Sequence, residues 1–150
     1  MRDKSLSDFA DKIMETMRMF ARGFGKKHNN ELCRGKITMP QFIILDFLST
    51  RHDAMMTDVA KYLEISTAAV TGMMDRLQKS GYLGRVHDVK DRRIVRLKLT
   101  SKGKKLVVKI HEERRQMIIT MFSKISQPER DEYLRILTKI KDAIIIGGGK

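Results

Sequence analysis

Apolar positions near the start of the 150-residue chain follow a helical period. Between residues 7 and 24 they recur at spacings of four, four, three and four, which places them on one stripe of an amphipathic helix. The stripe consists of Phe9, Ile13, Met17, Phe20 and Phe24. The polar run at residues 26–34 interrupts the pattern, so the first helix is predicted to end there.

A second predicted helix begins after Thr38, because Thr38 and Gln41 have the spacing of a capping box. Pro40 fits the first turn of this helix, where a missing N–H loses no intrahelical hydrogen bond. Residues 42–48 are apolar nearly all round, so we expect this helix to lie in the core.

The centre of the chain predicts two helices joined by a tight turn. Residues 57–63 form the first helix, residues 64 and 65 the turn, and Ser66 caps the second helix, which Gly81 ends. The apolar face of the second helix consists of Val70, Met73, Met74 and Leu77, and its other face carries Thr67, Ala68, Thr71, Asp75, Arg76 and Lys79. Two helices joined this closely form a helix-turn-helix.

Two strands are predicted at residues 82–87 and 94–99, because polar and apolar residues alternate in the second of them. The charged residues 88–93 between them form the tip of a hairpin. Such a tip can be a simple solvated turn. Directly after a helix-turn-helix, we interpret it as a wing.

The last third of the chain predicts two further helices. One runs from Thr100 to about residue 124, and the capping pattern of Ser126 and Glu129 opens the other. The predicted fold class is therefore mainly α with a small β-wing. Its parts are an N-terminal helix and loop at residues 1–37, a winged helix-turn-helix domain at 38–103, and C-terminal helices with a tail at 104–150.

Positive charge is concentrated in the predicted helix-turn-helix and wing. The chain has 31 Lys and Arg against 18 Asp and Glu, a net charge of +13. Residues 76–109 contain twelve basic and two acidic residues, so most of the excess lies in this stretch. A polyanionic partner is expected, and the alternative is a solvated face that only keeps the protein soluble.

Composition also limits where the protein works. Cys33 is the only cysteine, so an internal disulfide is excluded and a reducing compartment is expected, with a redox-sensing thiol as an alternative. No apolar run reaches the length of a membrane span, and residues 1–11 lack the apolar core of a signal peptide. We therefore expect a cytoplasmic protein without membrane contact.

Little in the sequence indicates a metal, a cofactor or catalysis. The potential metal ligands are His28, Cys33, His52, His87 and His111. None of them has a tight ligand spacing, so no metal site is predicted, although a metal-responsive regulator stays an alternative. No nucleophile motif, phosphate-binding glycine loop or carboxylate cluster is present, and we predict neither enzymatic activity nor a cofactor.

Several spaced residues of the helix-turn-helix and wing form one long pattern. It consists of Ser66-x-x-x-Val70-Thr71-x-x-x-Asp75-Arg76-Leu77-x-x-x-Gly81-Tyr82-Leu83, followed by Arg85, Asp88, Asp91-Arg92-Arg93 and Leu99-Thr100-x-x-Gly103. This pattern resembles the signature of the MarR family of bacterial and archaeal regulators. The flanking helices match the family's order, so the resemblance covers essentially the whole chain. It implies a transcriptional regulator, most often a repressor, that is an obligate homodimer whose first helix and last two helices interlock. Apolar stripes on both terminal helices support the dimer independently, with an intramolecular cap over the core as the alternative.

The predicted DNA contacts lie on the helix-turn-helix and the wing. The small polar residues at the start of the recognition helix suit base edges and phosphates, and Arg76 reaches a phosphate or a guanine. The recognition-helix set is Ser66, Thr67, Ala68, Thr71 and Arg76. By resemblance, Arg93 enters the minor groove, Asp91 orients the wing tip, and Arg92 and Lys90 meet phosphates. Lys79, Lys98 and Lys102 add phosphate contacts. A two-fold dimer predicts a pseudo-palindromic double-stranded site with half-sites about 10 bp apart.

The resemblance also implies a small ligand, often aromatic and anionic, that releases DNA from a site between the dimer helices and the winged domain. Candidate lining residues are Met14, Met17, Met39, Phe42 and Met117, and the alternative is that these residues belong to the core. A different alternative for the whole protein is an architectural role, in which the basic patch binds DNA without reading its sequence.

Overall fold

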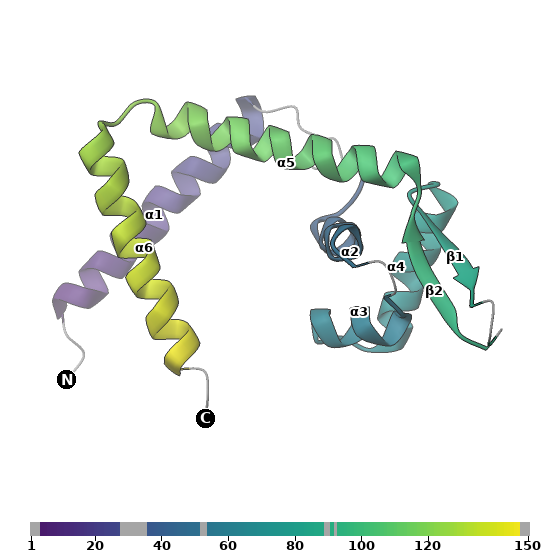
Figure 1. Cartoon of the computed structure of the whole chain (residues 1–150). Coiled ribbons are helices and arrows are strands. Elements are labelled where there is room, and N and C mark those ends of the chain that lie inside the picture. The colour runs from purple at the N-terminus through teal and green to yellow at the C-terminus, as the bar shows by residue number, and fades with distance from the viewer. Residues whose placement is uncertain (1–3, 28–35, 52–53, 89–90, 92, 148–150) are drawn as a thin grey trace. The chain divides into compact units, whose positions relative to one another are not determined.

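The computed structural model describes residues 4–27, 36–51, 54–88, 91 and 93–147 (Figure 1). In chain order, the elements of these residues are α1 (Lys4–Lys27), α2 (Met39–Ser49), α3 (Met56–Leu63), α4 (Thr67–Lys79), β1 (Leu83–His87), β2 (Val95–Leu99), α5 (Ser101–Phe122) and α6 (Gln127–Gly147). The chain divides into two compact units, residues 1–111 and residues 112–150.

The predicted fold class is confirmed: the described chain is mainly helical, with one antiparallel pair of strands. The differences lie at the ends of elements. The first helix extends at both ends beyond the predicted residues 7–24, and each strand begins one residue later than predicted. Terminal turns carry few core residues, so the apolar pattern does not mark them. The predicted boundaries at residues 37 and 103 remain predictions.

The entry to α2 has the predicted capping box. The Gln41 backbone N–H donates to Thr38 Oγ1 at 3.4 Å, and the Thr38 backbone N–H donates to Gln41 Oε1 at 2.9 Å. Both exchanges satisfy backbone donors that the first turn of a helix leaves without intrahelical partners. Phe42, Ile44 and Leu45 are almost fully buried, so α2 forms the centre of the core as its continuous apolar sequence predicts.

The turn between α3 and α4 is closed by backbone geometry. Glu64 has the left-handed backbone conformation (φ 54°), and the Ile65 N–H donates to the Ala60 carbonyl. Ser66 then caps α4, because its Oγ accepts a hydrogen bond from the Ala69 N–H. The predicted inward face is confirmed, since Val70, Met74 and Leu77 are buried and Met73 packs against the core. The helix-turn-helix is therefore present as expected.

The two strands form the predicted hairpin beside α4 (Figure 1). Leu83 pairs with Leu99, and His87 pairs with Val95. Leu97 is fully buried, and its N–H donates to the Ala54 carbonyl at 2.9 Å, which fastens β2 to the segment before α3. The hairpin is thus anchored at its base by burial, while its tip extends from the core.

The second unit has a different character. Arg130 Nη1 donates to the carbonyls of Phe122 and Ile125 at the end of α5, and the rings of Phe122 and Tyr133 lie 5.0 Å apart. Before α6, the Ser126 backbone N–H and hydroxyl donate to Glu129, which lowers the pKa of that carboxyl group. Among the described residues of this unit, none is buried.

A helix that crosses a membrane is both long and apolar. None of the described helices has both properties.

Candidate DNA-binding interface

The outward face of α4 carries small and basic side chains. Thr67, Ala68, Arg76 and Lys79 are exposed, and Thr71 is half-buried, as their predicted positions opposite the core require. Gly72 belongs to the same surface, because a Cβ built there meets nothing within 4 Å. Sequence reasoning overlooked Gly72, although an isolated glycine inside a predicted helix lowers helix stability and is therefore a signal in itself. The result is a low, open helix surface.

Two hydroxyl groups of this surface already have roles within the helix. Thr71 Oγ1 donates to the Thr67 carbonyl at 2.8 Å, so its proton is used but its oxygen can still accept. Ser66 Oγ accepts from Ala69, which leaves its proton available as a donor. Ser66 can therefore still donate to a groove, whereas Thr71 can only accept.

Asp75 holds the first strand of the hairpin onto α4. Its Oδ1 accepts a hydrogen bond from Arg85 Nη2 at 2.6 Å. Arg76, the next residue of α4, is a second cation close to this carboxylate in the sequence. In the described part of the chain the structure gives Arg76 no ion pair, and its side chain is exposed. Arg76 can therefore extend toward a ligand.

A chain of carboxylate contacts organises the wing. Asp88 Oδ2 accepts from Arg96 Nε at 3.0 Å and lies 2.9 Å from Arg96 Nη2 in an ion pair, while Asp88 Oδ1 accepts from the Asp91 N–H. Asp91 Oδ1 in turn accepts from the Arg93 N–H at 2.9 Å. The wing is thus braced at the base by Arg96, a positioning residue that appeared in the sequence only as part of the polar edge of a strand.

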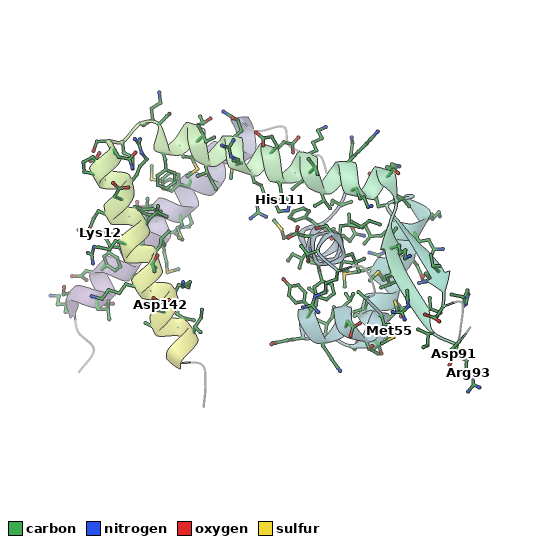
Figure 2. All side chains as sticks on the ribbon, in the orientation of Figure 1. Lys12, Met55, Asp91, Arg93, His111 and Asp142 are labelled. Atoms are coloured by element: carbon green, nitrogen blue, oxygen red, sulfur yellow. The ribbon has the colours of Figure 1, made fainter. Side chains whose placement is uncertain are left out.

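Arg93 projects from this braced tip. Its side chain is 94% exposed, and its Nε lies 3.9 Å from Asp91 Oδ1 (Figure 2). The hydrogen bond to Asp91 holds the backbone of Arg93, whereas its exposed side chain is free to reorient. Lys90 and Arg92, the other two predicted cations of the wing, lie outside the described residues.

The start of α5 donates hydrogen bonds to three successive carbonyl groups that follow α4. We call this set of contacts the α4–α5 junction. Lys102 Nζ donates to the Ser80 carbonyl at 2.8 Å, Thr100 Oγ1 to the Gly81 carbonyl at 2.7 Å, and the Thr100 N–H to the Tyr82 carbonyl at 3.1 Å. Thr100 Oγ1 also accepts from the N–H of Gly103. The Thr100-x-x-Gly103 part of the signature therefore has a structural role in the α4–α5 junction.

The α4–α5 junction also requires a glycine at residue 103. A Cβ on this residue would lie 2.0 Å from the Tyr82 carbonyl oxygen, which is backbone and cannot move aside cheaply.

Three lysines were predicted to contact phosphates. Lys79 and Lys98 are exposed, with no hydrogen bond or ion pair given by the described structure. Lys102 is exposed too, but its ammonium group is already bound.

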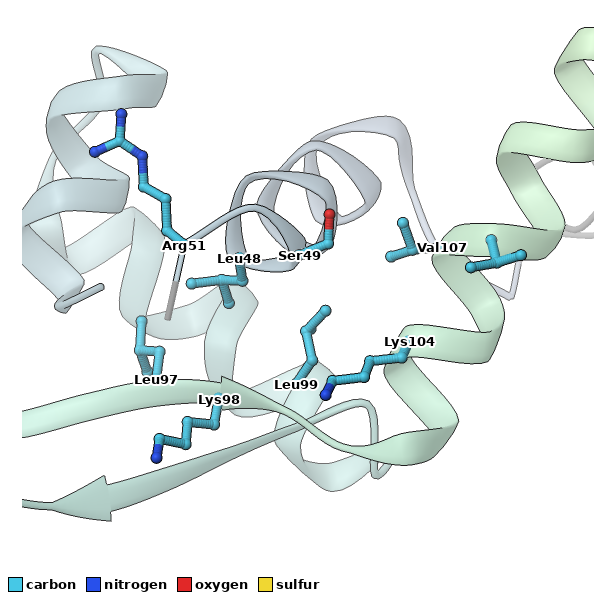
Figure 3. A pocket seen from close by; sticks show the side chains of 9 residues that line it. Leu48, Ser49, Arg51, Leu97, Lys98, Leu99, Lys104 and Val107 are labelled. Atoms are coloured by element: carbon cyan, nitrogen blue, oxygen red, sulfur yellow. The ribbon is translucent and has the colours of Figure 1, made fainter. Parts of the chain in front are cut away.

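A cavity of about 640 Å³ opens in the first unit between the end of α2, β2 and the start of α5 (Figure 3). It is lined by Leu48, Ser49, Arg51, Leu97, Lys98, Leu99, Lys104, Val107 and Val108. Five of these described residues are apolar, three are cations and none is acidic. The lining of the cavity therefore combines apolar residues with three cations.

The five residues predicted to line a ligand site have separate environments. Phe42 is in the core, where its ring packs edge-on against His111. Met14, Met17 and Met39 are exposed in the first unit, and Met117 lines an apolar groove of the second unit. None of them lines the cavity of Figure 3.

The candidate metal ligands do not form a site in the part of the chain that the structure describes. No group of three or more His, Cys, Asp or Glu residues there could hold a metal ion. His111 Nε2 lies 2.7 Å from Asp46 Oδ1, which accounts for one of the histidines as a link between α2 and α5 (Figure 2). His28, Cys33 and His52 lie outside the described residues.

Comparison with known proteins identifies the family. The sequence model of the MarR family matches residues 37–95. The HTH-type transcriptional regulator YkoM of Bacillus subtilis is 30% identical over 132 residues, covering 86% of each chain. The HTH-type transcriptional repressor MdtR of the same organism is 25% identical over 138 residues, covering 89% of each chain.

A solved structure of similar fold was determined on DNA. A variant of MepR from S. aureus, bound to an oligodeoxyribonucleotide, is 25% identical with a TM-score of 0.66, covering 88% of this chain and 97% of that chain. YkoM and MdtR are named as a transcriptional regulator and a transcriptional repressor, which confirms the prediction of a regulator rather than an enzyme. The match to the family model and the identity with YkoM show that the chain belongs to the MarR family of HTH-type transcriptional regulators.

Proposed function

We propose that this protein is a homodimeric repressor that reads a pseudo-palindromic operator in double-stranded DNA. The observation that carries the proposal is an exposed, braced wing tip in the same compact unit as the open face of α4. Asp91 fixes the backbone of Arg93, whose side chain is almost fully exposed, within that unit. An exposed guanidinium on a hairpin and a low helix surface in one unit suit contact with a minor and a major groove.

In the major groove, α4 supplies the sequence readout. The absence of a side chain at Gly72 and the small side chains of Thr67 and Ala68 allow the helix backbone to approach the bases. Ser66 provides a donor, Thr71 an acceptor, and Arg76 reaches a guanine or a phosphate. These complementary groups read the donor and acceptor pattern of a half-site.

In the minor groove, Arg93 supplies a readout of shape. A narrow A·T-rich groove concentrates negative potential and attracts a guanidinium. The brace from Arg96 through Asp88 to Asp91 supports this proposal, because a tip held in place before binding loses less conformational entropy on the DNA. Lys79 and Lys98 add phosphate contacts that strengthen binding without specifying sequence.

Dimerisation follows from the apolar faces of the terminal helices. Phe9 is 60% exposed in α1, and Leu134 and Ile144 are 62% and 68% exposed in α6. A second copy of the chain would bury these side chains and give the dimer two recognition helices. Half-sites about 10 bp apart then follow from the two-fold symmetry.

The cavity of Figure 3 supports a ligand that releases DNA. Its apolar and cationic lining residues suit an amphipathic anion, and it adjoins β2 and the start of α5. The cavity differs from the methionine-lined site predicted from sequence. Addition of octanoate to the protein–DNA complex should weaken operator binding more than addition of octanol; equal effects of the two would argue against an anion site.

A mobility-shift assay across a salt series tests the DNA-binding proposal. We expect one genomic fragment, such as the promoter of the protein's own gene, to bind far more tightly than random competitor DNA. Arg93→Ala should reduce this affinity by about tenfold to a hundredfold, whereas Arg115→Ala, an exposed arginine of the second unit, should leave it unchanged. Uniform salt-sensitive binding to every fragment would instead indicate an architectural protein.

A further inference from the structure

Lys102, a residue of α5, contacts the C-terminal end of the recognition helix α4. Its Nζ donates to the carbonyl of Ser80, the C-cap residue of α4, at 2.8 Å. The same ammonium group lies 4.7 Å from the centroid of the Tyr82 ring. A cation at this end of a helix also interacts favourably with the partial negative charge of the helix dipole. One side chain therefore holds the end of α4 in three ways.

The remaining contacts of the α4–α5 junction make this end of α4 a fixed point. Gly81 has a positive φ of 74°, and the N–H of Tyr82 donates to the Leu77 carbonyl, so the chain turns sharply out of the helix. Thr100 holds the next two carbonyl groups, those of Gly81 and Tyr82. The start of α5 thus binds three consecutive peptide units, and a displacement of α5 is transmitted directly to α4.

Lys102 differs in this respect from the other cations of the surface. Lys79 and Lys98 are exposed, with no hydrogen bond or ion pair in the described structure, and can follow the phosphate backbone. The ammonium group of Lys102 would have to leave the Ser80 carbonyl and the Tyr82 ring to do the same. A phosphate contact by Lys102 would therefore loosen the helix that reads the bases.

We infer that Lys102 is a positioning residue that sets the recognition helix for sequence readout, and not a phosphate contact. The inference rests on the proposed sequence-specific binding and adds to it a route by which α5 controls α4. Loss of the ammonium group removes a charge-assisted hydrogen bond and a cation–π contact but leaves the fold around Gly103 intact. The expected defect is in discrimination between DNA sequences.

Lys102→Met tests this inference, because methionine keeps the apolar stem and removes only the charge. Lys98→Met is the matched control from the same predicted set of phosphate contacts. Both variants and the parent protein are titrated with a preferred fragment and a scrambled duplex over a salt series. Circular dichroism and thermal unfolding of each variant establish that it is folded.

The two roles give different results. If Lys102 positions α4, Lys102→Met lowers the affinity ratio of preferred to scrambled DNA by about fivefold and leaves the salt slope unchanged. Lys98→Met makes the slope of log K against log salt shallower by about 0.9 for each subunit, about 1.8 for the dimer, and leaves the ratio unchanged. A Lys102→Met protein that behaves like Lys98→Met would overturn the inference.

A measurement without DNA separates this inference from the proposed function. Hydrogen exchange at the amides of Ser80, Gly81 and Tyr82 should become faster in Lys102→Met and return toward the parent rate in Lys102→Arg, which restores a cation. Unchanged exchange in Lys102→Met would overturn the positioning role even if the protein reads DNA. Lack of preference in the parent protein would reject sequence-specific binding, and the exchange result would still decide the role of Lys102.

Discussion

The winged part of the chain and the terminal helices both carry many apolar side chains but differ in how far they bury them. In the winged part, Leu45, Val70 and Leu97 are fully buried, whereas Met17 of α1 and Ile144 of α6 are about two-thirds exposed at 66% and 68%. The helical period determines which side chains share a face, but not what covers that face. A second copy of the chain is the covering that we propose for the terminal helices.

The stability of the two regions should therefore depend on different interactions. The winged part buries its apolar area within one chain, so its stability is expected to be independent of protein concentration. The terminal helices expose theirs, so their order should depend on association. Substitutions chosen in each region test this contrast.

The largest expected effect is that of Gly103→Ala in the winged part. The new Cβ would lie 2.0 Å from the Tyr82 carbonyl, so the α4–α5 junction must open. We expect a loss of about 3 kcal/mol in the free energy of unfolding, measured by denaturant titration. Gly72→Ala is the control, since its Cβ meets nothing within 4 Å and should stabilise α4 by about 0.5–1 kcal/mol. Equal stabilities for the two variants would contradict the role assigned to the junction.

A substitution in α6 should affect association and spare the winged part. Leu137→Glu places a charge in the apolar groove of the second unit, where Leu137 is 43% exposed in the single chain. Dimer dissociation should become about a hundredfold easier, as measured by analytical ultracentrifugation. Lys139→Gln, a change at an exposed polar site of the same helix, should have no such effect. A dimer that survives Leu137→Glu unchanged would place the interface elsewhere.

The smallest expected effect concerns the wing tip, which is ordered without being buried. Asp91→Ala removes the acceptor of the Arg93 N–H. Affinity for the preferred fragment should fall by about fivefold, because the tip must then be ordered on binding, while the unfolding free energy changes by less than about 0.5 kcal/mol. Asp58→Ala, which removes the carboxylate that accepts from Met55 N–H before α3, is a comparison for a local acceptor outside the wing. Its effect should be on stability and not on affinity.

Local patterns predicted the elements well. The Thr38 capping box, the Ser66 cap and the inward face of α4 were all predicted, because each depends on residues within about one or two helical turns. The resemblance also marked Asp88, Asp91 and Thr100 before their partners were known. Sequence reasoning did not assign Arg85 to Asp75 or Arg96 to Asp88, because these pairs join residues ten and eight positions apart on different elements.

The sequence by itself determined the order of helices and strands, the apolar faces and the concentration of positive charge around the helix-turn-helix and wing. Only the tertiary structure decided which of those charges are bound within the chain. Lys98 and Lys102 look equivalent in the sequence, but the fold brings the Ser80 carbonyl and the Tyr82 ring to Lys102 alone. The physical reason is that a hydrogen bond depends on distances between elements far apart along the chain, which no local period specifies.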